Sequence, residues 1–308
     1  MKKFIKTIFI ISTIFILIGC KDFVYELNSD KTGYILKEYN GSAESVIIPD
    51  AYKGLPITEI GANAFYANKH ISGNLAIPKN VKIIGEWAFS DCKNLESITF
   101  HDSITEIRKG AFFNCSRLTG NLNIPKSLSK IAESAFSHTG YTNLIIPKNI
   151  KIIEKNAFSG SDFTDHIIIP DNIIEMGDKA FSHCNRIKKI TLSKNIKRIG
   201  EETFRRCDEL EDIVIPEGVI EIGDRAFFEC FKPKSAIIPS TVTSIGILSF
   251  ADCNNLTKII CNASTPPITD NRAFEHSSIQ SIIVPKDSIT AYQNADGWKT
   301  FANIITSQ

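Results

Sequence analysis

The sequence is nearly balanced in charge and lacks the motifs that mark most enzymes. Its 308 residues hold 35 basic and 34 acidic side chains, a formal net charge of +1. This balance gives no electrostatic reason to expect nucleic acid or an anionic membrane surface as a partner. The sequence has no H-E-x-x-H pair and no glycine-rich phosphate loop. We therefore predict a protein that is not an enzyme and carries no cofactor.

Long apolar stretches are also scarce, and the only candidate lies at the N-terminus. Lys2, Lys3 and Lys6 precede a mostly apolar run from Ile8 to Ile18, which is short for a membrane-spanning helix of about 20 residues. The run closes with Leu-Ile-Gly-Cys at residues 17–20, which resembles a bacterial lipobox. The resemblance implies cleavage before Cys20 and acylation of that cysteine, so that the lipid alone holds the chain to the membrane.

What the sequence has in abundance is a repeat of about 23 residues, marked most clearly by phenylalanine. Ten phenylalanines follow one another at intervals of 22 to 24 residues, and eight of them are preceded by alanine. A constant period of this length predicts a solenoid, in which each unit buries its apolar face only against its neighbours. The phenylalanines are Phe65, Phe89, Phe112, Phe136, Phe158, Phe181, Phe204, Phe227, Phe250 and Phe274.

Each unit has three parts. An extended stretch ends in an apolar residue and proline, as at Ile215 and Pro216, because proline cannot continue a strand ladder. A short Val/Ile-x-x-Ile-Gly piece follows, as at residues 219–223, where we expect the glycine to form a turn that a side chain would obstruct. Ala-Phe-x-x-Cys completes the unit, with the phenylalanine filling the interior.

This pattern resembles the BspA-like class of leucine-rich repeat, whose motif runs Leu-x-x-Ile-x-Ile-Pro-x-x-Val-x-x-Ile-Gly-x-x-Ala-Phe-x-x-Cys. The match extends from about Phe23 to the C-terminus, and its departures are local: His101 and Ser193 replace the proline, and Arg108, Ala132 and Glu154 replace the glycine. The resemblance implies a leucine-rich-repeat solenoid of about ten coils, with a parallel β-sheet on one face, short strands and turns on the other, and a cap at each end.

The expected organisation has four parts. Residues 1–19 form the leader, residues 20–45 a hairpin that caps the first coil, residues 46–281 the repeats, and residues 282–308 a last strand and a C-terminal cap. A cap is expected at each end because an open solenoid would otherwise expose its core and its strand edges.

Six cysteines lie three residues after a repeat phenylalanine, which stacks one cysteine per coil. Zinc sites need paired spacings such as C-x2-C, which this sequence does not have. We predict that these cysteines are small, buried core residues. Disulfides between neighbouring coils remain an alternative, since an exported protein can form them, and metal binding is a remote one. The cysteines are Cys92, Cys115, Cys184, Cys207, Cys230 and Cys253.

A binding surface is predicted where the strand before each proline points outward. If Ile213 and Ile215 face the core, Val214 faces solvent. The same position in other coils gives an apolar row with varied polar residues beside it, as in a protein-binding surface; the strand preference of Ile and Val would also explain the row. The candidates are Ile145, Ile168, Thr191, Val214, Ile237 and Ile260 in the row, and His166, Lys189, Asp212 and Lys258 beside it.

Together these features predict a lipid-anchored protein of the bacterial cell envelope, in the outer membrane or at the cell surface. The family resemblance implies adhesion, with a protein of another cell or of the extracellular matrix as the partner. A structural envelope component that assembles laterally and an accessory carbohydrate-binding or carbohydrate-processing subunit are the alternatives.

Overall fold

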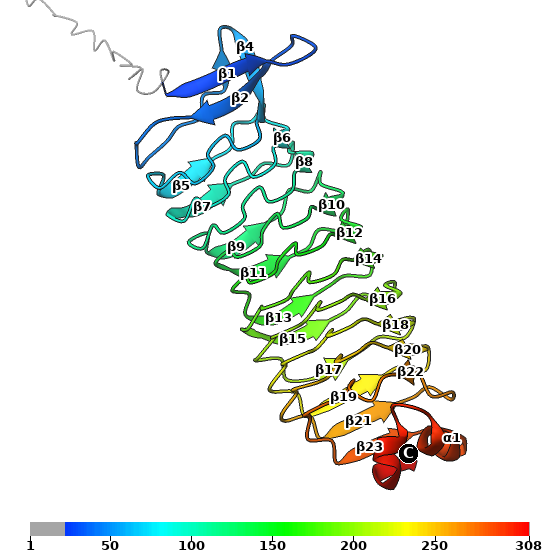
Figure 1. The fold of residues 1–308 in the computed structure, drawn as a ribbon. Coiled ribbons are helices and arrows are strands. Elements are labelled where there is room, and N and C mark those ends of the chain that lie inside the picture. The colour runs from blue at the N-terminus through cyan, green and yellow to red at the C-terminus, as the bar shows by residue number, and fades with distance from the viewer. Residues whose placement is uncertain (1–21, 308) are drawn as a thin grey trace, which may run out of the picture.

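The protein is an elongated solenoid, described by a computed structural model over residues 22–307 (Figure 1). The leader and Cys20 lie outside the described residues. The coil makes about 12 turns, of which ten carry the repeat phenylalanine. Within residues 22–307 no helix is long and apolar enough to span a bilayer.

Each regular coil contributes one strand to either side of the rod, as the numbering in Figure 1 shows. We call the side formed by the odd-numbered strands from β5 to β23 the odd-strand face. Its strands are β5 (Gly73–Ala76), β7 (Leu95–Thr99), β9 (Gly120–Asn123), β11 (Tyr141–Ile145), β13 (Asp165–Ile168), β15 (Ile187–Thr191), β17 (Ile213–Val214), β19 (Ser235–Ile238), β21 (Lys258–Cys261) and β23 (Ser281–Val284).

The even-numbered strands from β6 to β22 form the opposite side, the even-strand face. All nine are two residues long, and the strands that pair within this face run parallel. They are β6 (Ile83–Ile84), β8 (Glu106–Ile107), β10 (Lys130–Ile131), β12 (Ile152–Ile153), β14 (Glu175–Met176), β16 (Arg198–Ile199), β18 (Glu221–Ile222), β20 (Ser244–Ile245) and β22 (Ile268–Thr269).

A column of aromatic rings runs through the core between the two faces. The ten repeat phenylalanines are all buried, and each ring stacks on the next at centroid distances from 4.8 to 6.2 Å. Tyr39 and Trp298 extend the column at its two ends, 5.3 Å from Phe65 and 5.5 Å from Phe274. The prediction that phenylalanine fills the interior is confirmed, and every coil is supported by its neighbours alone.

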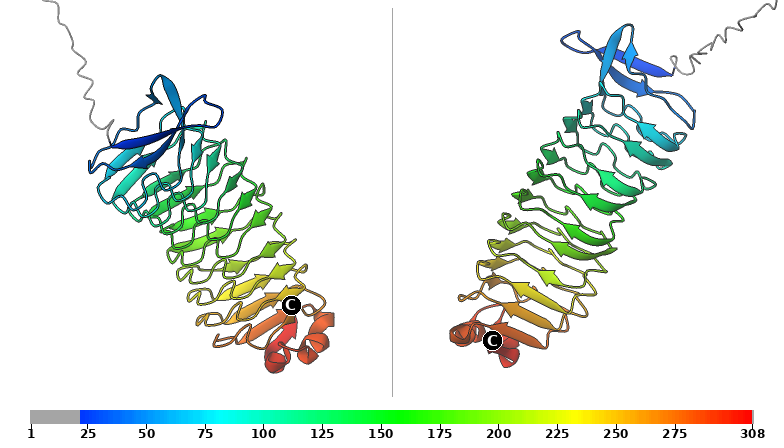
Figure 2. Two further views of the ribbon diagram at one scale, coloured as in Figure 1. Left: turned by 45° about the horizontal axis from the view of Figure 1, so that its top comes forward. Right: turned by 180° about the vertical axis from the view of Figure 1, so that it is seen from behind.

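The N-terminal end is closed by a β-hairpin, and the C-terminal end by a short helical segment (Figure 2). Strands β1 (Phe23–Leu27) and β2 (Tyr34–Tyr39) pair antiparallel, and β2 pairs parallel with β4 (Leu55–Ile60), which also pairs with β3 (Ala51–Tyr52). At the other end lie η1 (Lys286–Ser288), α1 (Ile289–Asn294), η2 (Lys299–Ile304) and β24 (Ile305–Ser307). Trp298 is fully buried and donates its indole N–H to the Pro267 carbonyl at 2.9 Å. Both ends of the core are thus covered by the chain itself.

The repeat cysteines are buried and free, as predicted for core residues, and they also donate hydrogen bonds. Each Sγ lies 3.0 to 3.4 Å from the carbonyl oxygen of the phenylalanine one coil earlier. Ser161 and Ser277 occupy the same position in coils without the cysteine and donate to the Phe136 and Phe250 carbonyls. Burial raises the pKa of the Cys92, Cys184 and Cys253 thiols to about 12, so they stay protonated donors at neutral pH.

The repeat glycines have a different role from the predicted one. Gly85 and Gly223 do not adopt a left-handed conformation. A Cβ atom on Gly85 would lie 2.6 Å from the backbone of the preceding coil, so the glycine permits close stacking rather than a turn. The left-handed residues lie two positions after every repeat phenylalanine and two positions before all of them except Phe274, as at Lys179 and His183 with φ of 60° and 59°.

Candidate protein-binding face

Strand pairing on the odd-strand face aligns the outward residues into a row along the rod axis. Asn123 pairs with Ile145, and Ile168 with Thr191. Further along, Val214 pairs with Ile237, Ile237 with Ile260, and Ile260 with Ile283. Directly paired side chains on one face lie within contact distance. The six predicted row residues therefore belong to one row of outward positions, although they do not all lie on paired strands.

Exposure divides this row into two parts. Ile145, Ile168 and Val214 are 74%, 54% and 53% exposed, and Thr191 is exposed as well. Ile237 and Ile260, which we expected to be as open as the others, are only half-buried. Both lie inside the sheet from β17 to β24, where an apolar neighbour covers each of them from either side.

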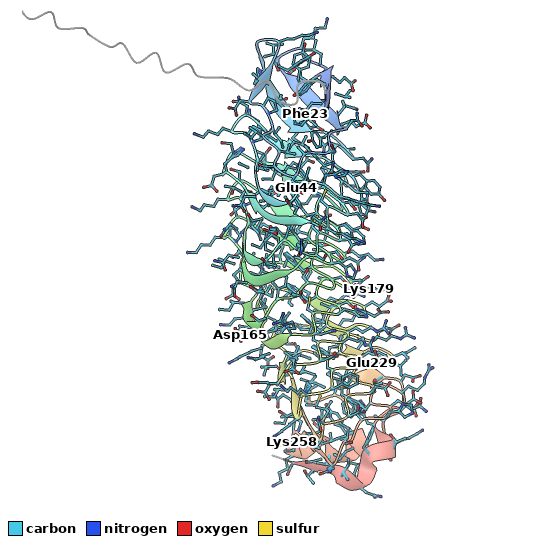
Figure 3. The ribbon with its side chains drawn as sticks, turned by 90° about the vertical axis from the view of Figure 1, so that its left-hand side faces the viewer. Phe23, Glu44, Asp165, Lys179, Glu229 and Lys258 are labelled. Carbon is cyan, nitrogen blue, oxygen red and sulfur yellow. The ribbon has the colours of Figure 1, made fainter. Side chains whose placement is uncertain are left out.

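The polar residues beside the row are exposed, and they differ from coil to coil. His166 Nε2 lies 2.8 Å from Thr191 Oγ1 in the paired strand. The side chains of Lys189, Asp212 and Lys258 are exposed and make no hydrogen bond or ion pair within residues 22–307. Figure 3 looks onto this side of the rod, with Asp165 and Lys258 labelled along one edge. These charges are therefore available to a partner.

The odd-strand face is not one continuous sheet, which the sequence did not predict. Pairing stops at three places: between β7 and β9, between β11 and β13, and between β15 and β17. Backbone hydrogen bonds still cross these gaps, from Thr119 N to the Glu96 carbonyl, from Thr164 N to the Thr142 carbonyl and from Glu211 N to the Lys188 carbonyl. The first and the last gap follow the coils in which His101 and Ser193 replace the proline, whereas the middle one follows a coil that keeps it at Pro147. The inward residues before His101 and Ser193, Ile98 and Ile190, are half-buried instead of buried.

The first and the last of these gaps each have a hollow beside the outward row. The larger, of about 330 Å³, lies between β7 and β11 and has Ile145 in its wall. Its lining is mostly apolar, and its charged rim is formed by Asp102 and Lys126, whose side chains pair at 3.7 Å. The narrower one, between β15 and β17, includes Val214 and Asp212 and reaches Phe204 and Phe227. The loss of proline at His101 and Ser193 was the sequence signal that could have marked both.

The even-strand face is built from ion pairs between coils. Arg198 bridges Asp178 at 2.8 Å and Glu221 at 2.9 Å, and Lys130 pairs with Glu154 at 2.6 Å. The exposed Ile174 and Ile220 on this side do not continue into a row, because Lys197 occupies the equivalent position in the coil between them. Much of the charge on this face is therefore neutralised within the protein.

The groups that could support catalysis are few in the described chain. Residues 22–307 contain no group of three or more His, Cys, Asp or Glu side chains that could hold a metal ion. One serine–histidine contact occurs that the sequence did not indicate: Ser182 Oγ lies 2.9 Å from His183 Nδ1. The pKa of His183 is lowered by burial and by the nearby Arg205 and Arg206 guanidinium groups. Ser182 is only 2% exposed and lines neither hollow of the odd-strand face.

Several solved bacterial proteins have the same architecture. A leucine-rich cell surface protein from Faecalibacterium prausnitzii matches with a TM-score of 0.54 and 21% identity, over 93% of this chain and 92% of that one. A leucine-rich repeat protein from Bacteroides ovatus gives 0.62 and 24%, over 93% and 74%. The pneumococcal vaccine antigen PcpA gives 0.62 and 18%, over 88% and 82%. At these identities the likeness establishes the fold.

The sequence itself matches a known repeat family over most of its length. No curated protein matches it. The profile of the "BspA type Leucine rich repeat region" matches residues 58–188, 129–256 and 174–296, six copies in all. The described solenoid covers all of these residues. The chain therefore belongs to the BspA-type leucine-rich repeat family.

Proposed function

We propose that this protein is a lipid-anchored, extracytoplasmic scaffold of the bacterial cell envelope that adheres to protein partners through its odd-strand face. The exposed apolar row with Ile145, Ile168 and Val214 carries the proposal. Covering apolar surface contributes about 25 cal/mol of favourable free energy per Å². Covering the ion-paired even-strand face would instead require removing charged groups from water, which costs free energy. The resemblance to a protein described as a cell surface protein supports the location.

The anchor determines how the face would be presented. Cys20 is two residues before the first described residue, and that residue begins the cap at one end of the rod (Figure 1). An acyl chain on Cys20 would hold this end at the membrane. The rod would then project away from the membrane, with its C-terminal end outermost and the odd-strand face open to the side.

The two faces offer matched variants that test the binding surface. Ile145→Asp, Ile168→Asp and Val214→Asp together place three carboxylates on the odd-strand face. Ile174→Asp, Ile220→Asp and Ile268→Asp do the same on the even-strand face, where the wild-type side chains are 57%, 47% and 81% exposed. The readout is attachment of cells displaying each variant to immobilised matrix proteins and to a layer of neighbouring cells. We expect attachment to fall at least tenfold for the first variant and to stay unchanged for the second.

An equal loss in both variants, or no loss in the first while it remains folded, would refute binding through the odd-strand face.

The anchor is tested separately. Cys20→Ser should abolish incorporation of radiolabelled palmitate and release the protein from the membrane fraction. Protease treatment of intact cells should remove the wild-type protein if it is displayed outside, and protection of the protein from protease would place it on the periplasmic side instead.

A further inference from the structure

Two neighbouring coils carry opposite bands of charge across the odd-strand face. The coil of β15 presents Arg186, Lys188 and Lys189, and the coil of β17 presents Glu209, Glu211 and Asp212. The two sets occupy the same three positions of the repeat, 23 residues apart. All six side chains are exposed except Glu209, which is half-buried. We call them the basic band and the acidic band.

The two bands do not neutralise each other within one molecule. Lys188 pairs with Asp165 of the preceding coil at 3.1 Å, and Glu209 pairs with Lys232 of the following coil at 2.5 Å. Both ion pairs thus point away from the other band. Within residues 22–307 no ion pair joins the basic to the acidic band, and pairing between β15 and β17 stops at this point. Arg186, Lys189, Glu211 and Asp212 therefore leave charges of both signs open to a partner.

The arrangement is self-complementary under a two-fold rotation. Consider an axis that lies on the odd-strand face, parallel to the strands and midway between β15 and β17. Rotation about it places a second copy face to face with the first, with β15 over β17, β13 over β19 and β11 over β21. The basic band of each copy then covers the acidic band of the other, and Asp165 comes opposite the coil that holds Lys234.

The apolar row obeys the same symmetry. Ile168 comes opposite Ile237 and Ile145 opposite Ile260, so exposed residues meet half-buried ones, and the exposed Thr191 and Val214 come opposite each other. A two-fold interface needs one patch that is complementary to itself. We infer that the partner of the odd-strand face is a second copy of this chain, packed antiparallel. This inference rests on the proposed function of that face and names its occupant.

The area of the interface indicates how stable the dimer would be. Eight strands from β9 to β23 at a spacing of about 4.8 Å, each about four residues long at about 3.3 Å per residue, cover roughly 500 Å² per copy. The total of about 1,000 Å² for both copies is at the lower limit for a specific interface, so we expect a single dimer to be weak. Many copies tethered to the same membrane would bind together more strongly than one.

Because the rods are antiparallel, their N-terminal ends point in opposite directions. Two copies anchored at Cys20 would therefore join two facing membranes.

Charge reversal tests this inference directly, with residues 21–308, whose core both caps close. Sedimentation equilibrium measures the dimer constant. One variant reverses the basic band (Arg186→Glu, Lys188→Glu and Lys189→Glu), and another reverses the acidic band (Glu209→Lys, Glu211→Lys and Asp212→Lys). Each alone should dimerise at least tenfold more weakly than wild type, because like charges then face each other. An equimolar mixture should regain wild-type association as a heterodimer, and so should a single chain with both bands reversed.

The matched control reverses three lysines of the opposite side, Lys151→Glu, Lys155→Glu and Lys197→Glu, and should dimerise as wild type does. A wild-type chain that stays monomeric up to about 1 mM, or reversed variants whose mixture does not recover, would overturn the second copy as the partner. A different result would overturn the proposed function: cells displaying Ile145→Asp, Ile168→Asp and Val214→Asp together would still attach to matrix proteins and to other cells.

Discussion

The two faces of this solenoid come from the same coils and share one core, yet their outward residues behave in opposite ways. On the even-strand face, Arg198 is engaged by two carboxylates from different coils. On the odd-strand face, Ile145 is 74% exposed, and Lys189 and Asp212 have no ion-pair partner within residues 22–307. The exposed apolar side chains of the odd-strand face share one row, whereas on the even-strand face Lys197 separates Ile174 from Ile220. Binding is therefore expected on the side where exposed apolar residues line up beside unpaired charges.

The largest predicted effect concerns the core that both faces share. Phe181 is fully buried between Phe158 and Phe204, with ring centroids 5.2 and 6.0 Å away. Phe181→Ala should lower the free energy of unfolding by about 3–5 kcal/mol, since it removes a large side chain and leaves a cavity. Chemical denaturation measures the change. Phe113→Ala, at a half-buried ring on the turn edge, is the control and should cost clearly less. Equal losses would show that the stacked column is not what supports the coils.

Alkaline pH should weaken the same core through its thiols. The pKa of Cys184 is raised by burial from 9.0 to about 12, so the folded state favours the neutral thiol. The stability that this protonated thiol contributes is fully present below pH 9 and is lost as the pH rises toward 12, because the unfolded chain releases its proton first. At pH 10 the loss amounts to about 1.4 kcal/mol for one thiol.

Cys184→Ser provides the matched control, because Ser161 and Ser277 make the same hydrogen bond naturally. The stability difference between wild type and this variant should shrink between pH 8 and pH 10 in urea titrations. A difference that does not change with pH would show that the thiol ionises as easily in the folded protein as in the unfolded one.

On the even-strand face, a smaller loss is expected from Arg198→Ala. Its ion pairs involve side chains that are 32% to 48% exposed, so the variant should lose no more than about 1 kcal/mol. Added salt should reduce the difference further, as screening weakens exposed pairs. Thermal unfolding at low and high salt measures this change. Attachment to partners should remain at the wild-type level, and a fall in attachment would give this face a part in binding.

The smallest effect on stability is expected on the odd-strand face. Ile145→Asp alone should change the unfolding free energy by no more than about 0.5 kcal/mol, because its side chain is mostly in solvent already. The same variant should lower attachment measurably. A strongly destabilised variant would mean that Ile145 supports the fold, and its exposure would then say nothing about a partner.

The sequence predicted the solenoid because one strong periodic signal, the phenylalanine column, is enough to specify it. It predicted which residues of each strand point outward for the same reason, since alternation is a local property. It did not predict that Ile237 and Ile260 are half-buried, because their cover comes from neighbouring coils. The three gaps in the odd-strand face were also missed: His101 and Ser193 marked two of the coils, but the gap after β11 follows a coil that keeps Pro147. Backbone pairing is a contact between coils, and a repeat read within one coil does not specify it.

The most direct test of the central claim is lysine labelling with and without the partner. Lys189 and Lys258 are exposed on the odd-strand face, and Lys130 and Lys197 are exposed on the even-strand face. Acetylation of each lysine, followed by mass spectrometry, compares free protein with protein bound to the surface it adheres to. We predict that Lys189 and Lys258 become protected on binding while Lys130 and Lys197 keep their reactivity. Protection of Lys130 and Lys197, with Lys189 and Lys258 still reactive, would contradict the account.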